Sequence, residues 1–162
     1  TWINTLENSR SIRAIEVFVE DKKIIGSETY WAVFNTTIRR PESLALPYEH
    51  FELYPDLKAT NATFSKINLH NEKEIVFEKT IVLSDLDIVN HVNNIKYLEW
   101  CLDFVDTELI LNQNIASFEM NFLKELSQMD KVVIHQNKMV KSLVFCGTKE
   151  ETICFALQLN MK

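Results

Sequence analysis

Glycine is scarce in this chain, with two residues among 162, against a usual share of about 7%. Glycine-rich phosphate loops and dinucleotide-binding fingerprints need several glycines close together, so the sequence excludes both. Gly26 and Gly147 each stand in what the surrounding pattern indicates is a connection between two strands. No apolar run approaches the roughly 18 residues that suggest a membrane-spanning helix, so we expect no membrane contact.

Cysteine is also sparse, and the three residues Cys101, Cys146 and Cys154 lack the spacing of metal ligands. An odd number of cysteines in apolar segments is typical of reduced, buried thiols in a cytoplasmic protein. We therefore predict no metal and no cofactor. The chain opens at Thr1 without a secretory signal pattern, and we expect it to be processed or to be part of a longer protein.

Positive charge is in the minority, and the formal net charge is −6. This balance argues against nucleic-acid binding, and an acidic protein partner would need a local basic patch. Lys22, Lys23, Arg39 and Arg40 are candidates for such a patch, although solvated surface charges are the more ordinary interpretation.

The pattern divides the chain into two unequal parts. Residues 11–20 and 27–36 are rich in β-branched and aromatic residues and predict a β-hairpin. All three prolines follow, in a stretch that has no sustained period and is long for a loop inside one compact domain. The predicted organisation is a partial N-terminal module over 1–40, a linker over 41–71 and a C-terminal module over 72–162.

The C-terminal part has a regular pattern. Strands are predicted over 75–83, 117–122, 131–146 (one or two strands) and 152–161. Between the first two, apolar residues recur at steps of three and four from Ile95 to Leu109, which predicts one long helix. Because this helix is apolar on most sides, the antiparallel sheet must curl over it to cover it. The fold class is therefore α+β, with a sheet wrapped around a helix.

Two carboxylates stand between the first of these strands and the helix. Asp85 and Asp87 are placed so that either could serve as a base or a nucleophile. The alternative is that they and Asn90 are turn and cap residues, which are common before helices. His91 could position water or polarise a carbonyl group, or could be a structural histidine.

Two asparagines, Asn93 and Asn94, open the predicted helix. The first backbone N–H groups of a helix are unpaired and lie at its positive end, so they are candidates to stabilise an oxyanion. The alternative is that one of the two asparagines caps the helix.

The segment DLDIVNHVNNIKYLEW resembles the signature of acyl-acyl-carrier-protein thioesterases of plants and bacteria, and more loosely that of the 4-hydroxybenzoyl-CoA thioesterase group. The matching positions are Asp85, Asp87, His91, Val92, Asn93, Asn94, Lys96 and Tyr97. Downstream, Glu125 falls on the glutamate of the family's catalytic site. The resemblance implies a tandem hotdog fold whose first module lacks its first strand and its first long helix here.

Two positions depart from the plant pattern. Val89 stands where that pattern has asparagine, with Asn90 as a neighbouring candidate substitute, and Leu126 stands where plant enzymes carry cysteine. A Cys–His–Asn mechanism is therefore excluded at these positions. The resemblance leaves Asp87 as base or nucleophile, with Glu125 and His91 orienting water or substrate.

Three functions follow as hypotheses. The first is hydrolysis of fatty acyl thioesters on acyl carrier protein, which releases free fatty acid and ends chain elongation. The second is an acyl-CoA thioesterase, and the third is a non-catalytic hotdog module that binds acyl chains. Because hotdog modules usually pair around their active sites, we expect pairing within the chain or between chains, the latter as a homodimer.

Overall fold

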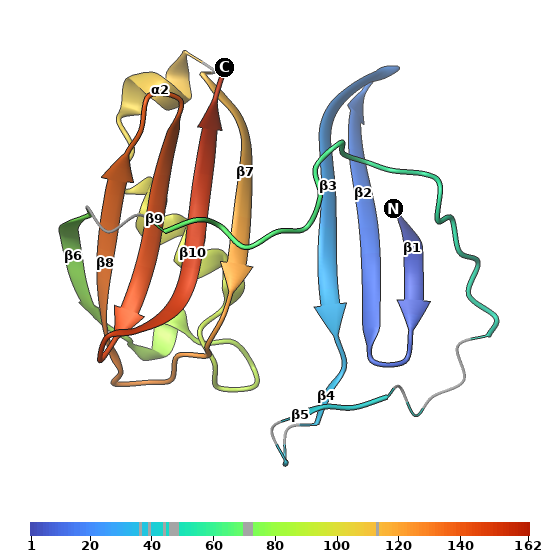
Figure 1. The fold of residues 1–162 in the computed structure, drawn as a ribbon, viewed down its shortest axis with the longest axis horizontal. Helices are drawn as coiled ribbons and strands as arrows, with labels where there is room; N and C mark the ends of the chain where they lie inside the picture. The colour runs from blue at the N-terminus through green and yellow to red at the C-terminus, as the bar shows by residue number, and fades with distance from the viewer. Residues whose placement is uncertain (36, 39, 44, 46–48, 70–72, 113) are drawn as a thin grey trace. The chain divides into compact units, whose positions relative to one another are not determined.

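The computed structural model divides the chain into two compact units, Thr1–Phe64 and Ser65–Lys162, and each is described by itself (Figure 1). It describes residues 1–35, 37–38, 40–43, 45, 49–69, 73–112 and 114–162. Arg39, one of the predicted carrier contacts, and residues 44, 46–48, 70 and 71 of the predicted linker lie outside this part.

The first unit is built on a three-stranded antiparallel sheet in the order β1-β2-β3. Its strands are β1 (Trp2–Glu7), β2 (Arg10–Val19) and β3 (Lys22–Ala32), and a short pair follows, β4 (Phe34–Asn35) with β5 (Arg40–Pro41). The predicted hairpin is present as β2 and β3. Its turn, however, is the residue pair between Val19 and Lys22, where Glu20 adopts a positive φ of 53°. The prediction that Gly26 lies in the connection is therefore wrong.

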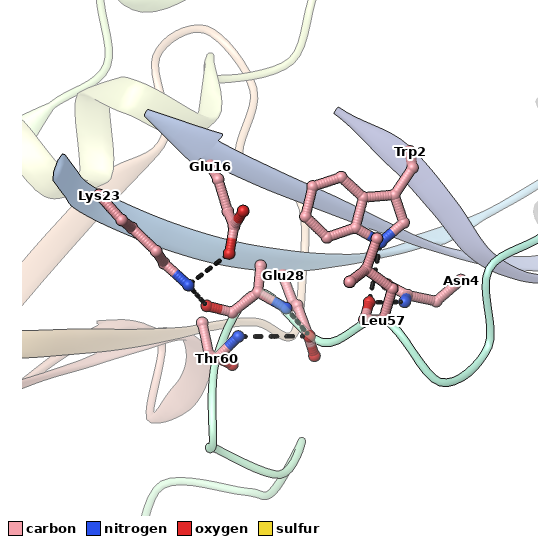
Figure 2. A network of polar contacts seen from close by, with 8 residues as sticks. Trp2, Asn4, Glu16, Lys23, Glu28, Leu57 and Thr60 are labelled. Carbon is pink, nitrogen blue, oxygen red and sulfur yellow. Dashed lines mark hydrogen bonds and ion pairs between the residues drawn. The ribbon is translucent and has the colours of Figure 1, made fainter. Parts of the chain in front are cut away.

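Gly26 lies inside β3, and another segment of the first unit passes directly over it. This close approach explains why the position has no side chain. A Cβ atom at this position would lie 2.2 Å from the carbonyl oxygen of Ala59. Polar side chains of the sheet hold that segment in place (Figure 2). Lys23 Nζ donates to Ala59 O at 2.6 Å, and a Glu28 carboxylate oxygen accepts the Ala59 N–H at 2.9 Å. Trp2 Nε1 donates to Leu57 O at 2.8 Å. This part of the predicted linker is thus bound to the first sheet.

The second unit is a five-stranded antiparallel sheet in the order β6-β8-β9-β10-β7. Its elements are β6 (Glu74–Thr80), the 3₁₀ turn η1 (Leu83–Asp85), α1 (Asn94–Leu102), α2 (Thr107–Leu111), β7 (Ile115–Phe122), β8 (Lys131–Lys138), β9 (Ser142–Lys149) and β10 (Thr152–Met161). Figure 1 shows α1 behind the strands. Trp100 and Cys101 of α1 pack in one buried cluster with Phe145 and Leu157 of the sheet. The prediction of a hotdog arrangement, a sheet around a helix, is confirmed.

The helical region differs from the single long helix expected from the apolar spacing. The helix α1 ends at Leu102, and α2 begins after Asp106, whose side chain accepts the N–H of Glu108 at 2.9 Å. An aspartate that caps a helix N-terminus competes with helix continuation, which explains the break. Val105, which lies between the two helices, is nevertheless buried. The apolar spacing therefore predicted which residues are buried, although the helix is interrupted.

Gly147 also lies inside a strand and not in a connection, contrary to prediction. A Cβ atom there would lie 2.1 Å from Cε1 of Phe155, so the aromatic ring occupies the space that a side chain would need. The turn between β9 and β10 is formed by Glu150 and Glu151, which have φ values of 47° and 67°. Both turns thus place glutamates in a conformation that favours glycine.

The three cysteines are free and buried, as expected. Burial raises the pKa of the Cys101 thiol far above its ordinary value, and the neighbouring Cys146 adds to this effect. Within the described ranges, no helix has the length and apolar character that crossing a membrane requires.

Candidate active site

Residues 85–93 form a loop that is closed by pairing across its neck, and we call it the 85–93 loop. The N–H of Asn93 donates to Asp85 O at 2.9 Å, and the N–H of Asp87 donates to His91 O at 2.8 Å. Between these two bonds, Leu86 and Val92 form an antiparallel bridge. Two of the residues predicted as catalytic, Asp87 and His91, therefore face each other across the neck.

The carboxylate of Asp87 is oriented by the backbone of its own loop. Its Oδ1 atom accepts the N–H of Val89 at 2.9 Å and the N–H of His91 at 3.2 Å. This is the side-chain turn that the sequence left open as an alternative to catalysis. The two interpretations are compatible, because Oδ1 serves the turn while Oδ2 has no hydrogen-bond partner in the described part of the chain.

His91 meets the predicted glutamate from a different segment. Its Nδ1 atom lies 3.5 Å from Oε1 of Glu125, and the two side chains are 25% and 44% exposed. The backbone supports this contact, since the N–H of Val92 donates to Leu126 O at 3.0 Å. The structure thus brings three predicted residues into one partly exposed cluster, Asp87, His91 and Glu125.

Asn93 has the capping role that the sequence offered as its alternative. Its side chain accepts the N–H of Ile95 at 3.1 Å, and its carbonyl accepts the N–H of Lys96 at 2.9 Å. Because its own N–H is donated to Asp85, it is not available for an oxyanion. Of the two amides predicted for that purpose, only the N–H of Asn94 stays a candidate.

The tip of the loop is exposed. Asn90 has a positive φ of 63°, a conformation that asparagine tolerates well, and its N–H donates to Asp87 O at 3.2 Å. Asn90 therefore shapes the turn, and a catalytic role for it stays a prediction. Val89 contributes its backbone N–H to Asp87, while its side chain is 57% exposed.

Leu126 explains one departure from the plant pattern. Its side chain is fully buried in the core of the second unit, together with Val92 and Tyr97. A side chain at this position points into the core, so leucine contributes packing here and no nucleophile.

Two further residues at the site were not predicted from the sequence to act there. Tyr97 closes the family motif and is 4% exposed. Burial is the largest cause that raises its pKa to about 12; the charges of Cys154, Asp87 and Asp130 add to this, while a backbone hydrogen bond from Leu126 opposes it. Lys79 pairs with Asp85 at 3.0 Å, and its only signal in the sequence was a charged residue near the end of a strand.

The predicted carrier contacts belong to the first unit, Thr1–Phe64. Lys23 is bonded to Glu16 and Ala59, and Lys22, Lys23 and Arg40 are all exposed. The ranges that the structure describes contain no group of three His, Cys, Asp or Glu residues able to hold a metal ion.

A hollow of about 770 Å³ lies elsewhere in the second unit and does not include the catalytic candidates. It is lined by Lys73, Ile75, Met129, Asp130, Lys131, Val133, His135, Thr148, Lys149, Glu150 and Glu151.

Comparisons with known proteins identify the family of this chain. The family model of the acyl-ACP thioesterase C-terminal domain matches residues 69–161, more than half of the chain. An acyl-[acyl-carrier-protein] hydrolase of Cuphea viscosissima is 29% identical over 118 residues, which is 68% of this chain and 27% of that protein. A dodecanoyl-[acyl-carrier-protein] hydrolase of Cinnamomum camphora is 42% identical over 50 residues, 31% of this chain and 13% of that protein.

Solved structures show the same fold. An acyl-ACP thioesterase from Bacteroides thetaiotaomicron matches 99% of this chain and 66% of its own with a TM-score of 0.85 at 23% identity. The 12:0-ACP thioesterase from Umbellularia californica matches 99% of this chain and 65% of its own with a TM-score of 0.76 at 18% identity. The match of the family model over the module that carries Asp87, His91 and Glu125 shows that the chain belongs to the acyl-ACP thioesterase family.

Proposed function

We propose that this chain hydrolyses fatty acyl thioesters on acyl carrier protein and releases the free fatty acid. The observation that carries the proposal is the cluster of Asp87, His91 and Glu125, with Asp87 and His91 paired across the loop neck and His91 3.5 Å from Glu125. Membership of the family supports it. The chain spans less than a third of the curated relatives that it matches, so the activity is proposed and not transferred.

The chemistry that we propose begins at Asp87. Its Oδ2 atom would take a proton from a water molecule as that water attacks the thioester carbonyl, and the proton would pass to the carrier thiolate that leaves when the C–S bond breaks. In the alternative, Oδ2 would attack the carbonyl itself and expel the carrier thiolate, and water would then hydrolyse the acyl–Asp87 anhydride to the free acid. His91 and Glu125 would orient the water or the substrate. As the carbonyl oxygen gains negative charge, the N–H of Asn94 at the start of α1 would stabilise it, since a helix N-terminus presents unpaired donors.

Substitution of Asp87 tests this proposal in the full chain. Asp87→Asn keeps the acceptor that bonds to Val89 and His91 but loses the charge, so the loop should persist while turnover falls by about 10²- to 10⁴-fold. Asp103→Asn is the matched control, because it removes an exposed carboxylate from the end of α1. Near-normal hydrolysis of acyl thioesters by Asp87→Asn would refute the assignment.

The choice of carrier is a separate part of the proposal. Acyl carrier protein is favoured by the family, and acyl-CoA is the alternative. Of the basic residues expected to contact an acidic carrier, Lys23 is bonded to Glu16 and Ala59 within its own unit, and Lys22 and Arg40 are exposed in the described part of the chain. Comparing kcat/KM on matched acyl-carrier-protein and acyl-CoA substrates decides between the carriers. Acyl binding without any hydrolysis would favour a non-catalytic module.

We further propose that the protein forms a homodimer and acts in the cytoplasm. Pairing of hotdog modules around the active site is the basis for the dimer. Light scattering of the purified chain tests the dimer, and cell fractionation tests the location.

A further inference from the structure

An ion pair between the buried Asp85 and the half-buried Lys79 lies at the base of the 85–93 loop. We propose that Asp85, held by Lys79, is a positioning residue that fixes this loop so that Asp87 and His91 stay in place for thioester hydrolysis. The inference rests on the proposed function, since it concerns the same site. It assigns no chemical step to Asp85 or Lys79.

The carboxylate of Asp85 has two partners on one oxygen. Oδ2 lies 3.0 Å from Lys79 Nζ and accepts the N–H of Val82 at 2.9 Å. The side chains of Asp85 and Lys79 are 6% and 18% exposed. A carboxylate so little exposed is costly unless it is paired, and removing one partner leaves an uncompensated charge. The position of Asp85 therefore depends on Lys79.

The backbone of Asp85 transmits this position to the loop. Its carbonyl accepts the N–H of Asn93, the residue that caps α1. The Leu86–Val92 bridge and then the Asp87–His91 hydrogen bond follow along the neck. Displacement of Asp85 would therefore shift both sides of the neck together.

Lys79 also connects the pair to the helix. Its Nζ atom lies 5.2 Å from the ring centre of Trp100, a cation–π contact that favours a cation at this place. Trp100 belongs to α1 and is 6% exposed. The pair thus joins β6 to η1 and α1, the two elements on either side of the loop in the chain.

The test compares three variants of the full chain. Lys79→Met removes the ammonium group and keeps most of the apolar chain, Asp85→Asn removes the other charge, and Lys79→Arg keeps the cation. We expect the first two to lower kcat about ten- to a hundredfold, as a displacement of catalytic groups by about 1 Å can do, with little change in KM. Lys79→Arg should retain most of kcat.

Glu99→Gln is the matched control, since it breaks the exposed Lys96–Glu99 pair on α1 and should leave kcat unchanged. A purely structural role would lower the melting temperature while the folded variants keep the wild-type kcat, and that outcome overturns the inference. If Lys79→Met does not fold, Asp85→Asn carries the comparison.

Hydrogen exchange separates this inference from the proposed function. We expect Lys79→Met to speed amide exchange in residues 85–93 while β8 to β10 keep their wild-type rates, and Lys79→Arg to restore slow exchange. A wild-type protein without thioesterase turnover would refute the proposed function alone. Unchanged exchange in residues 85–93 would refute the anchoring role, whatever the activity.

Discussion

Leu126 departs from the plant pattern, which has cysteine at this position, and its packing explains why an apolar residue fits there. It follows directly on Glu125, yet its side chain is fully buried in the core while Glu125 is partly exposed. Its backbone carbonyl meanwhile holds Val92 at the loop neck. The backbone of Leu126 thus supports the 85–93 loop, and its side chain packs in the core. We therefore assign the chemistry to the partly exposed residues Asp87, His91 and Glu125.

Restoring the plant residue should therefore not restore a thiol mechanism. We expect Leu126→Cys to leave kcat at or below the wild-type value and to lower the free energy of unfolding by roughly 1 to 3 kcal/mol, because buried apolar volume is lost. Turnover assays and urea unfolding measure the two effects. Leu126→Ala is the control for lost volume, and a higher kcat in the cysteine variant alone would contradict this account.

The buried hydroxyl of Tyr97 predicts a loss of stability at high pH. Its pKa is raised to about 12 in the folded chain, with burial as the largest cause, whereas an unfolded tyrosine has a pKa of about 10. The folded chain keeps this proton where the unfolded chain loses it, so the contribution is present below about pH 10 and is lost as pH rises through about 12.

We expect Tyr97→Phe to lose less stability than the wild type between pH 8 and pH 11, by about 1 kcal/mol. Urea unfolding at the two pH values measures the difference. Tyr30→Phe is the control, since Tyr30 is 49% exposed. Equal pH dependence of Tyr97→Phe and the wild type would show that this proton is not linked to folding.

Among the strands, the two glycines show how a neighbouring group can exclude a side chain from a strand position. Gly147 in β9 gives space to the ring of Phe155, and Gly26 in β3 gives space to the carbonyl of Ala59. Both lie in strands although glycine is unfavourable there, because a side chain would meet a neighbouring group. The turns beside them use glutamates at positive φ instead.

The two glycine positions should respond differently to alanine. Gly147→Ala forces a Cβ atom into an aromatic ring in the core, and we expect a loss of about 1 to 3 kcal/mol in the free energy of unfolding. Gly26→Ala meets the backbone at Ala59, so we expect faster amide exchange in residues 57–60. Each variant is the control for the other, and identical responses would contradict the assignment of one glycine to the core and the other to the bound segment.

At the scale of the whole molecule, the two units differ in how much they bury. The core cluster of the second unit contains fully buried side chains such as Phe145, Phe155 and Leu157. The sheet of the first unit buries Ala14 and contacts Ala59, whereas Ile25 and Trp31 are 53% and 58% exposed. Local stability follows buried apolar contact, so the units should differ in stability.

We therefore expect amides of β2 and β3 to exchange sooner than amides of β8, β9 and β10. Hydrogen exchange of the full chain measures this, and a series of protein concentrations is the control for protection by self-association. Equal protection of both units at low concentration would contradict the expectation.

Features that depend on near neighbours in the chain are predictable from residue type and spacing. The motif from Asp85 to Tyr97, the alternating strands of the second unit and the capping role open to Asn93 could be read from spacing and residue type. Most of the fold class follows from these patterns, because apolar periodicity reports which face of an element is buried.

Features that join distant segments depend on long-range packing and are visible only in the folded chain. The contact of His91 with Glu125, the pairing of Lys79 with Asp85 and the segment over Gly26 each depend on packing that no local pattern encodes. The break between α1 and α2 is intermediate, since Asp106 is visible in the sequence but Val105 stays buried across it. Local sequence patterns identify the candidate residues of the site, and long-range packing determines which of these residues come into contact.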